Sequence, residues 1–431
     1  LARGHHQTLV GLTSFQVIHE SIVRPLTSCY DYLYEYIQER AAEKMPVYTV
    51  TFRKFADLII KNGVPFNNWN LYQANHVVRI AVILEDNSQY ENGQGCQYYL
   101  DRIFNHTVTR QWSILDMIES AYDENTGIWN ECPGYSLGVA GNFTGLITFL
   151  QNTLEIDLIP DMPVIPKAIT VSPQYLFPNK YIVGFGDTHY GKLRTGAMMD
   201  LVGNAQKFNR PYQEEEFTAL IKMLNESPSR ENLGRRRDAF SVLLEGVQAK
   251  LDAKIQAAEL SDYATQTFYA PTVSWLVQRN GLDPKHGLMI SQAASLGNHM
   301  HSNGIAIELY GKGYVLAPES GVGSSYFQPD YLEYYSQFPA HNTVVVDGIS
   351  KYPEMRSSHA FELNSMYPGS ARKDGYFPVI SFSDLYFLEP ETDADQNRVM
   401  SIIRTGETSG YYVDIFRSRR KNSRDKYHDY F

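Results

Sequence analysis

Hydrophobic residues recur at spacings of three and four over most of the first 265 positions, which is the pattern of amphipathic helices. Residues 70–84, NLYQANHVVRIAVIL, are typical, because one predicted face carries Val77, Val78, Ala81 and Val82. Short turns rich in Gly, Pro and Asn separate such segments, so the pattern predicts a series of helical hairpins. No fixed repeat length is visible, which disfavours a regular solenoid and leaves a closed helical toroid open.

After about residue 268 the hydrophobic period changes from the helical value to two, which is the period of a half-buried strand. The alternating runs, each bounded by turn residues, are 272–278, 287–294, 305–317, 342–348, 378–385, 398–406 and 410–416. Short strands without intervening helices favour an antiparallel β-sandwich. The sequence therefore predicts an α+β multidomain protein, with a helical domain over residues 1–265 and a β-sandwich domain over 266–431 that is truncated at its C-terminal end.

Composition narrows the class of ligand. The 431 residues include 31 Tyr and 21 Phe, and aromatic side chains at this density suit stacking on sugar rings, although most of them will belong to a core. The formal net charge is −10 with acidic and basic residues interleaved, which disfavours nucleic acid as a partner. An acidic polymer remains possible, because a cleft can be basic on an acidic protein.

Cysteines and apolar runs leave the compartment open. Cys29, Cys96 and Cys132 are widely spaced without a CxxC pattern, so they predict neither a disulfide scaffold nor a thiolate metal site. No apolar run approaches the ~18 residues of a membrane-spanning helix. Because the chain opens with LARGHHQTLV, without Met or a signal-type apolar core, we expect a processed start.

Four short stretches carry candidate chemistry. Residues 297–321, GNHMHSNGIAIELYGKGYVLAPESG, place His299 and His301 one residue apart, and on an extended segment these two side chains would point the same way. The other three stretches are FNNWNLYQANH at 66–76, GIWNECPGYSLG at 127–138 and FPAHNTVVVDG at 338–348.

Together these stretches give the order Asn, Tyr, His-x-His, Glu, His, which resembles the heparinase II/III-like polysaccharide lyases, including the related alginate and ulvan lyases. The resemblance covers nearly the whole chain and is most specific in NHMHSNGIAIELYGKGYVLAPESG and AHNTVVVDG. It implies an (α/α) toroid followed by an antiparallel β-sandwich. It also implies a secreted, periplasmic or cell-surface enzyme that cleaves a uronate-containing glycan by β-elimination, with alginate or ulvan favoured.

The resemblance implies that Asn68, Tyr135 and His299 are the catalytic residues. Elimination requires removal of the C5 proton and protonation of the leaving O4 atom, and a phenol and an imidazole at one sugar suit these two transfers. An amide against the uronate carboxylate, here Asn68, would stabilise the dianionic intermediate. Taken alone, Asn68 is equally well explained as a helix N-cap.

The resemblance further implies a structural metal held by His301, Glu319 and His341. Two imidazoles and a carboxylate suit Zn²⁺, with one further position for water. The family usually has Asp where this chain has Glu319, so two alternatives stay open: Asp187 as the ligand, or no metal at this place. Each histidine, taken alone, would more often serve a backbone hydrogen bond.

Further residues are expected to bind the substrate. Some relatives have His where this chain has Trp69, and a residue one turn on, on the face of Asn68, could replace that imidazole. The substrate-binding candidates are Tyr72, Asn75, His76 and Arg79 on that face, Asp187, His189, Tyr190 and Arg194 in GFGDTHYGKLR, and Tyr334 as a groove aromatic.

Two other classes of function stay open. A glycoside hydrolase on an (α/α) toroid would need two carboxylates about 5 to 10 Å apart, and Glu131 with Asp187 is the pair that the sequence offers. A noncatalytic glycan-binding protein could use the same aromatic side chains. Ultraviolet absorbance separates these functions, because only elimination leaves a conjugated double bond in the product.

Overall fold

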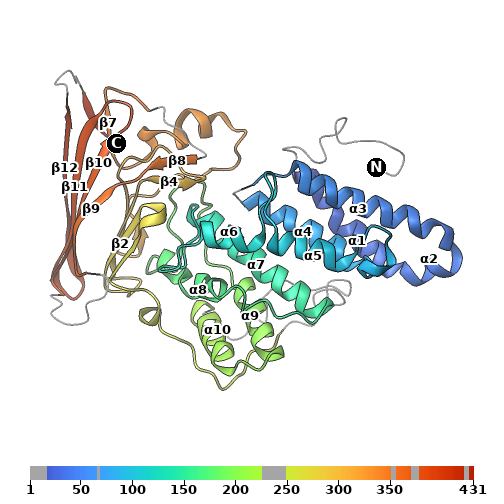
Figure 1. Cartoon of the computed structure of the whole chain (residues 1–431). Coiled ribbons are helices and arrows are strands. Elements are labelled where there is room, and N and C mark those ends of the chain that lie inside the picture. Colours follow the sequence, from blue (N-terminus) through green and yellow to red (C-terminus); the bar gives the residue numbers. More distant parts are fainter. Residues whose placement is uncertain (1–16, 66–67, 226–248, 351–355, 370–377, 422–426) are drawn as a thin grey trace. The chain divides into compact units, whose positions relative to one another are not determined.

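The computed structural model describes residues 17–65, 68–225, 249–350, 356–369, 378–421 and 427–431. Helices occupy the chain as far as Leu224 and strands begin at Thr267 (Figure 1). This order confirms the predicted fold class, a helical N-terminal region followed by antiparallel sheets. The helical pattern extended to residue 260, but 249–259 have no regular secondary structure and 226–248 lie outside the described residues.

The described residues form two compact units. Unit 1 contains those up to residue 122 together with 142–164, and unit 2 contains the others, so helices as well as sheets belong to unit 2. The division of the chain at residue 265 into two domains stays a prediction. Among the described helices, none has the length and apolar character needed to span a bilayer.

Unit 1 is helical. Its elements are η1 (Val17–Ile22), α1 (Val23–Tyr32), α2 (Tyr34–Arg40), η2 (Ala42–Lys44), α3 (Met45–Asn62), α4 (Asn68–Val82), η3 (Asn87–Gln89), α5 (Cys96–Asn105), α6 (Ile114–Ala121) and the second part of α7 (Pro133–Thr153). Helix α4 packs against α1, α3 and α5. Val77, Val78 and Ala81 are fully buried, which confirms the apolar face predicted for this helix.

Buried amides tie α4 to the rest of unit 1. The Asn70 side chain donates to the Trp112 carbonyl over 3.0 Å and accepts from the Trp112 amide over 2.9 Å. Gln73 Nε2 lies 3.1 and 2.9 Å from the two carboxyl oxygens of Glu20. These bonds satisfy polar groups that would otherwise be costly to bury.

Unit 2 combines helices with four antiparallel sheets. Its helical elements are the first part of α7, α8 (Val164–Thr170), η4 (Ser172–Tyr175), α9 (Gly196–Lys207), α10 (Pro211–Leu224), η5 (Leu260–Asp262), η6 (Pro271–Val273), η7 (Tyr331–Tyr335, a π-helix) and η8 (Phe338–Ala340). The first sheet, in the order β1-β2-β3-β5-β6, contains β1 (Thr267–Ala270), β2 (Trp275–Asn280), β3 (Leu288–Ala293), β5 (Ala306–Gly311) and β6 (Tyr314–Val315). The second, in the order β12-β11-β10-β9, contains β9 (Glu362–Tyr367), β10 (Ile380–Glu389), β11 (Ala394–Gly406) and β12 (Ser409–Arg420).

Two smaller pairs complete unit 2. One joins β4 (Ser295–Asn298) to β8 (Arg356–His359), and the other joins β7 (Val344–Val346) to β13 (His428–Tyr430).

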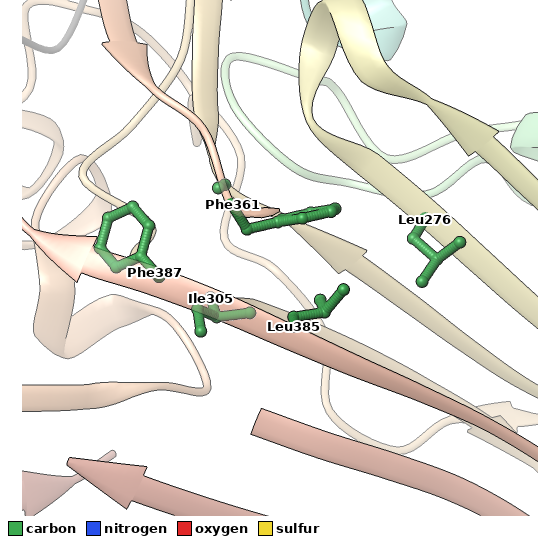
Figure 2. Packing of buried hydrophobic residues seen from close by; sticks show 6 residues of the cluster. Leu276, Ile305, Phe361, Leu385 and Phe387 are labelled. Carbon is green, nitrogen blue, oxygen red and sulfur yellow. The ribbon is translucent and has the colours of Figure 1, made fainter. Parts of the chain in front are cut away.

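The two large sheets of unit 2 face each other across an apolar core. Figure 2 shows Leu276 of β2 and Ile305 beside Leu385 and Phe387 of β10, with Phe361 in the same cluster. A second cluster joins residues of β3 and β5 to residues of β11. Because alternate residues of β10 and β11 are buried between the sheets, the strand period predicted this β-sandwich correctly.

The three cysteines are free and differ in exposure. Cys29 on α1 is exposed, whereas Cys96 at the start of α5 and Cys132 just before α7 are buried. Cys96 belongs to unit 1 and Cys132 to unit 2.

Candidate active site

Tyr135 and His299 lie against each other in unit 2. Tyr135 is in the first turn of α7, which begins at Pro133, a residue whose fixed φ suits a helix start. The phenol ring is stacked on the imidazole ring, with centroids 3.5 Å apart and planes 7° from parallel. The two residues expected to transfer protons are therefore adjacent, although 164 positions (299 − 135) separate them in the sequence.

The backbone at His299 departs from the predicted extended conformation. Strand β4 ends at Asn298, and His299 has a positive φ of 55°, so the simple alternation that would aim His299 and His301 the same way does not hold. The His299 carbonyl accepts from the Asp187 amide over 3.0 Å. At Gly186, where φ is 64°, a Cβ atom would lie 2.5 Å from this carbonyl oxygen, so only glycine fits beside it.

Glu131 holds the other side of the imidazole. Its Oε2 atom is 3.2 Å from His299 Nδ1, and the side chains of the two residues are only 0% and 7% exposed. Its Oε1 atom has no hydrogen-bond partner among the described residues. The sequence singled out Glu131 only as a possible hydrolase carboxylate, so its contact with His299 is a finding of the structure.

A chain of hydrogen bonds leads from Tyr135 to His301. The hydroxyl of Tyr135 is 2.7 Å from that of Tyr326, which donates to Asp187 Oδ2 over 3.1 Å. Asp187 Oδ1 accepts from the Tyr331 hydroxyl over 2.7 Å and lies 2.9 Å from His301 Nε2. Asp187 is buried and both of its oxygens are engaged by these side chains, and its role in substrate binding stays a prediction.

Sequence reasoning missed Tyr326 and Tyr331. Both lie in the tyrosine-rich segment SSYFQPDYLEYY, but with 31 tyrosines in the chain no local feature distinguishes them. The π-helix at Tyr331–Tyr335 is the one structural hint, since this rare conformation often occurs at functional sites.

Burial controls the protonation of Tyr135. It raises the pKa of the phenol to about 12, and the hydrogen bond with Tyr326 only partly opposes this shift. Tyr135 therefore carries its proton near neutral pH, which favours proton donation over proton removal as its first step.

The predicted metal ligands are neighbours, but they bond to one another or to Asp187. His341 Nδ1 forms a short hydrogen bond with Glu319 Oε2, and the rings of His301 and His341 are 5.4 Å apart. Three buried atoms of this set have no partner in the described part of the chain: His301 Nδ1, Glu319 Oε1 and His341 Nε2. Imidazole nitrogen and carboxylate oxygen are donor types that Zn²⁺ accepts.

A second buried carboxyl group, that of Glu308, is influenced by the charge of Glu319. Both oxygens of Glu308 on β5 accept from the Gly184 amide, at 2.6 and 2.8 Å. Burial, reinforced by the charge of Glu319, raises the pKa of Glu308 well above its ordinary value. Because both carboxyl groups are buried and their charges repel, a proton or a cation would stabilise the pair. However, no three His, Cys, Asp or Glu side chains within the described ranges are gathered as a metal-binding group.

The remaining candidates of unit 2 are at the surface. His189 and Arg194 are exposed. Tyr190 is 54% exposed and stacks on Tyr181, and Tyr334, in the π-helix, is 49% exposed. A pocket of about 590 Å³ in unit 2, between α10 and residues 254–263, contains none of the candidates.

The other candidates lie on α4 of unit 1. Asn68 is buried and its Oδ1 atom has no partner among the described residues, so this oxygen does not act as a helix cap. Asn75 donates to the Leu71 carbonyl over 3.0 Å, and Arg79 lies over the Phe149 ring at 4.3 Å. Tyr72 packs on Trp69, with ring centroids 5.8 Å apart.

His76 is the buried imidazole of that face. Burial lowers its pKa to about 4, and the charges of Arg24 and Arg79 add to this effect. Its Nδ1 atom has no hydrogen-bond partner in the part of unit 1 that the structure describes. His76 is therefore a candidate to replace the imidazole that some relatives have at the position of Trp69.

Two family models match parts of this chain. Residues 125–239 match the model of the second domain of endo-acting ulvan lyases, and residues 268–411 match that of the C-terminal region of heparinase II/III-like proteins. The first match contains Glu131, Tyr135 and Asp187, and the second contains His299 and His341. The chain is 26% identical to an endo-acting ulvan lyase of Formosa agariphila over 335 residues, covering 70% of this chain but 39% of that protein.

Solved structures share the fold. A heparinase III gene product with methylated lysines superposes with a TM-score of 0.54 and 13% identity, covering 97% of this chain and 56% of that one. The heparan sulfate lyase HepC of Pedobacter heparinus gives a TM-score of 0.51 at 15% identity, covering 88% of this chain and 49% of that one. The chain thus spans about half the length of these relatives or less.

Proposed function

Because the chain belongs to the heparinase II/III-like polysaccharide lyase superfamily, we propose that it cleaves a uronate-containing glycan by β-elimination. The observation that carries the proposal is the stacking of Tyr135 on His299, since elimination needs an acid and a base at the same sugar unit.

The two proton transfers suit these side chains. The C5 proton must leave, the C4–O4 bond must break, and O4 must gain a proton as the C4–C5 double bond forms. Tyr135 keeps its proton at neutral pH and is therefore a suitable donor to O4. His299, an imidazole held by a carboxylate, is a suitable acceptor.

Asn68 is proposed to neutralise the uronate carboxylate. The support is its place in the sequence pattern and its buried amide with an unpaired oxygen, which helix capping does not explain. Removing such a group should lower turnover by about 10² to 10³-fold, as does removing an oxyanion donor.

Ulvan is the substrate that the comparisons favour over alginate. The sequence similarity is to an endo-acting ulvan lyase, and one of the two matching family models describes the same enzymes. The likeness to lyases of heparan sulfate is at 15% identity or below and supports the fold alone. Because a glycan polymer is met outside the cytoplasm, we expect a secreted, periplasmic or cell-surface enzyme.

A structural Zn²⁺ ion held by His301, Glu319 and His341 forms part of the proposal. Its support is the three unpaired buried atoms and the neighbouring Glu308 carboxyl. When bound, the ion would supply positive charge to this acidic cluster. Chelation should then lower the melting temperature of the protein and added Zn²⁺ should restore it. Metal analysis without a bound ion, together with a melting temperature indifferent to chelator, would contradict this part.

The hydrolase alternative is disfavoured by the same geometry. Glu131 and Asp187 are both buried, and each is bonded to a histidine rather than presented to a water molecule. Neither carboxylate is placed for the acid and base roles of glycoside hydrolysis.

Mixing the protein with ulvan, alginate and heparan sulfate in turn, while following the absorbance of the unsaturated product, tests the proposal. We expect absorbance to rise with ulvan. Tyr135→Phe keeps the ring on His299 and removes the hydroxyl, so it and His299→Ala should lower turnover far more than binding. If both variants retain near-normal elimination, the assignment is wrong, and if the wild type only binds the polymer, the protein is a glycan-binding protein.

A further inference from the structure

We propose that Glu131 is the positioning residue of His299: it fixes the imidazole in the tautomer with the proton on Nδ1 and leaves Nε2 as the atom that accepts the substrate proton. This inference rests on the proposed lyase function and assigns His299 as the base and Tyr135 as the acid.

The Glu131 carboxylate and the His299 imidazole form a buried pair. Glu131 Oε2 is 3.2 Å from Nδ1, in surroundings where the Glu131 side chain is fully buried. An ionised carboxylate can only accept hydrogen bonds, so this contact requires a proton on Nδ1. Among the described residues the His299 ring has a hydrogen bond at Nδ1 alone, which leaves the lone pair of Nε2 for the substrate.

Glu131 and Tyr135, the two side chains that contact the His299 ring, come from one short turn of the chain. Glu131 forms a parallel bridge with Asn298, and the Asn298 amide donates to the Asn130 carbonyl over 3.1 Å. The chain then enters α7 at Pro133, which places Tyr135 on the ring of His299. Glu131 and Tyr135 are four positions apart. The single turn ECPGY therefore supplies both the carboxylate at the edge of the His299 ring and the phenol on its face.

The resulting step balances in protons and electrons. Nε2 takes the C5 proton, the electron pair of the C5–H bond forms the C4–C5 double bond, and the C4–O4 bond breaks as O4 takes the Tyr135 proton. Imidazolium and phenolate are then stacked, and a proton passing from the first to the second restores the enzyme. The Glu131 carboxylate beside Nδ1 would stabilise the imidazolium, as carboxylates do in acid–base triads.

As a positioning residue, Glu131 has a different role from the one that glycoside hydrolysis would give it. There Glu131 would touch the sugar, whereas here it acts only through His299. Its burial decides between the two, because a side chain with 0% exposure cannot reach a polymer.

Three substitutions of Glu131 test the inference in the full-length chain. Glu131→Gln keeps the shape and loses the charge, Glu131→Ala removes the contact, and Glu131→Asp keeps the charge on a shorter stem. We expect turnover on the cleaved polymer to fall by at least about 10²-fold in the first two, as in other carboxylate–imidazole pairs, with the Michaelis constant unchanged. Glu131→Asp should restore part of the loss.

Glu389 offers a matched control. It is also buried and accepts hydrogen bonds from the backbone amides of Glu391 and Thr392, at 2.9 and 2.7 Å, but it lies on β10. Glu389→Gln should lower the melting temperature without changing turnover. If Glu131→Gln behaves in the same way, the residue is structural and the inference is overturned.

A measurement without substrate separates this inference from the proposed function. The Nδ1 proton of His299 should give a far-downfield proton resonance that disappears in both Glu131→Gln and His299→Gln. A resonance that persists in Glu131→Gln overturns the positioning role. If the resonance behaves as expected but no uronate polymer is cleaved, the positioning role stands and the proposed lyase function fails.

Discussion

His299 is fixed by three groups that restrain different parts of the residue. Tyr135 covers the ring face, Glu131 meets Nδ1, and the Asp187 amide holds the carbonyl oxygen. The positive φ of 55° at His299 is a conformation that a non-glycine residue adopts at a cost, so these contacts must outweigh it. Such restraint keeps a proton-transferring ring in one orientation between reaction cycles.

At the surface, Tyr334 is expected to affect binding rather than chemistry. It is 49% exposed, and sugar rings stack on exposed aromatic faces. Tyr334→Ala should raise the Michaelis constant for the polymer more than it lowers turnover, in steady-state kinetics. Tyr212 on α10, at 87% exposure, supplies a control whose change to Ala should alter neither constant. Equal effects of the two substitutions would rule out a specific role for Tyr334.

At the scale of elements, the loop before α9 and the turn before α7 meet at a point where no side chain fits. A Cβ atom on Gly186 would lie 2.5 Å from the His299 carbonyl oxygen and 2.7 Å from Cys132 Cβ, and its φ is 64°. These two obstacles are backbone or buried side chain, so the loop would have to move.

We therefore expect Gly186→Ala to destabilise the protein by more than ~1 kcal/mol and to lower turnover by displacing His299. Gly138, also in unit 2, is the control: it lies inside α7 with nothing within 4 Å of its added Cβ. Gly138→Ala should leave turnover unchanged and stabilise the helix by about 0.5 to 1 kcal/mol. Thermal denaturation and kinetics of both variants check this, and a fully active Gly186→Ala would show that the loop tolerates the shift.

Elements with strong periodicity were predictable, and contacts between distant elements were not. Strands β10 and β11 bury every second residue, which the alternation of their sequences encodes. Strands β4 and β8 have the sequences SLGN and RSSH, too short and polar for such a signal. The contacts of Glu131 with His299 and of Asp187 with Tyr326 join positions 168 and 139 residues apart, which only the folded chain brings together.

At the scale of the whole molecule, unit 1 contains a buried acid whose protonation depends on folding. Burial raises the pKa of Glu20 from 4.5 to about 8, and the hydrogen bond from Gln73 only partly offsets this shift. Between these two pH values the folded chain holds a proton that the unfolded chain has released. The free energy of unfolding should therefore decrease as pH rises through this window.

Glu20→Gln should remove this decrease, because the amide is neutral in both states. Denaturant unfolding of the wild type and the variant at several pH values checks the prediction. His76, whose pKa burial lowers from 6.5 to about 4, opposes stability on the acid side, so the comparison is clearest above pH 6.5. An identical pH dependence in the two proteins would show that Glu20 is ionised in the fold.

Each unit contains a buried cysteine whose rate of reaction with a thiol reagent reports how often that unit opens. Cys29 is exposed and should react at once with a thiol reagent, whereas buried Cys96 and Cys132 should react only when their surroundings open. Since Cys96 reports on unit 1 and Cys132 on unit 2, mass spectrometry of labelled peptides over time measures two opening rates in one unmodified chain. Different rates would show that the units open independently, and polymer that protects Cys132 more than Cys96 would locate the ligand at the ECPGY turn.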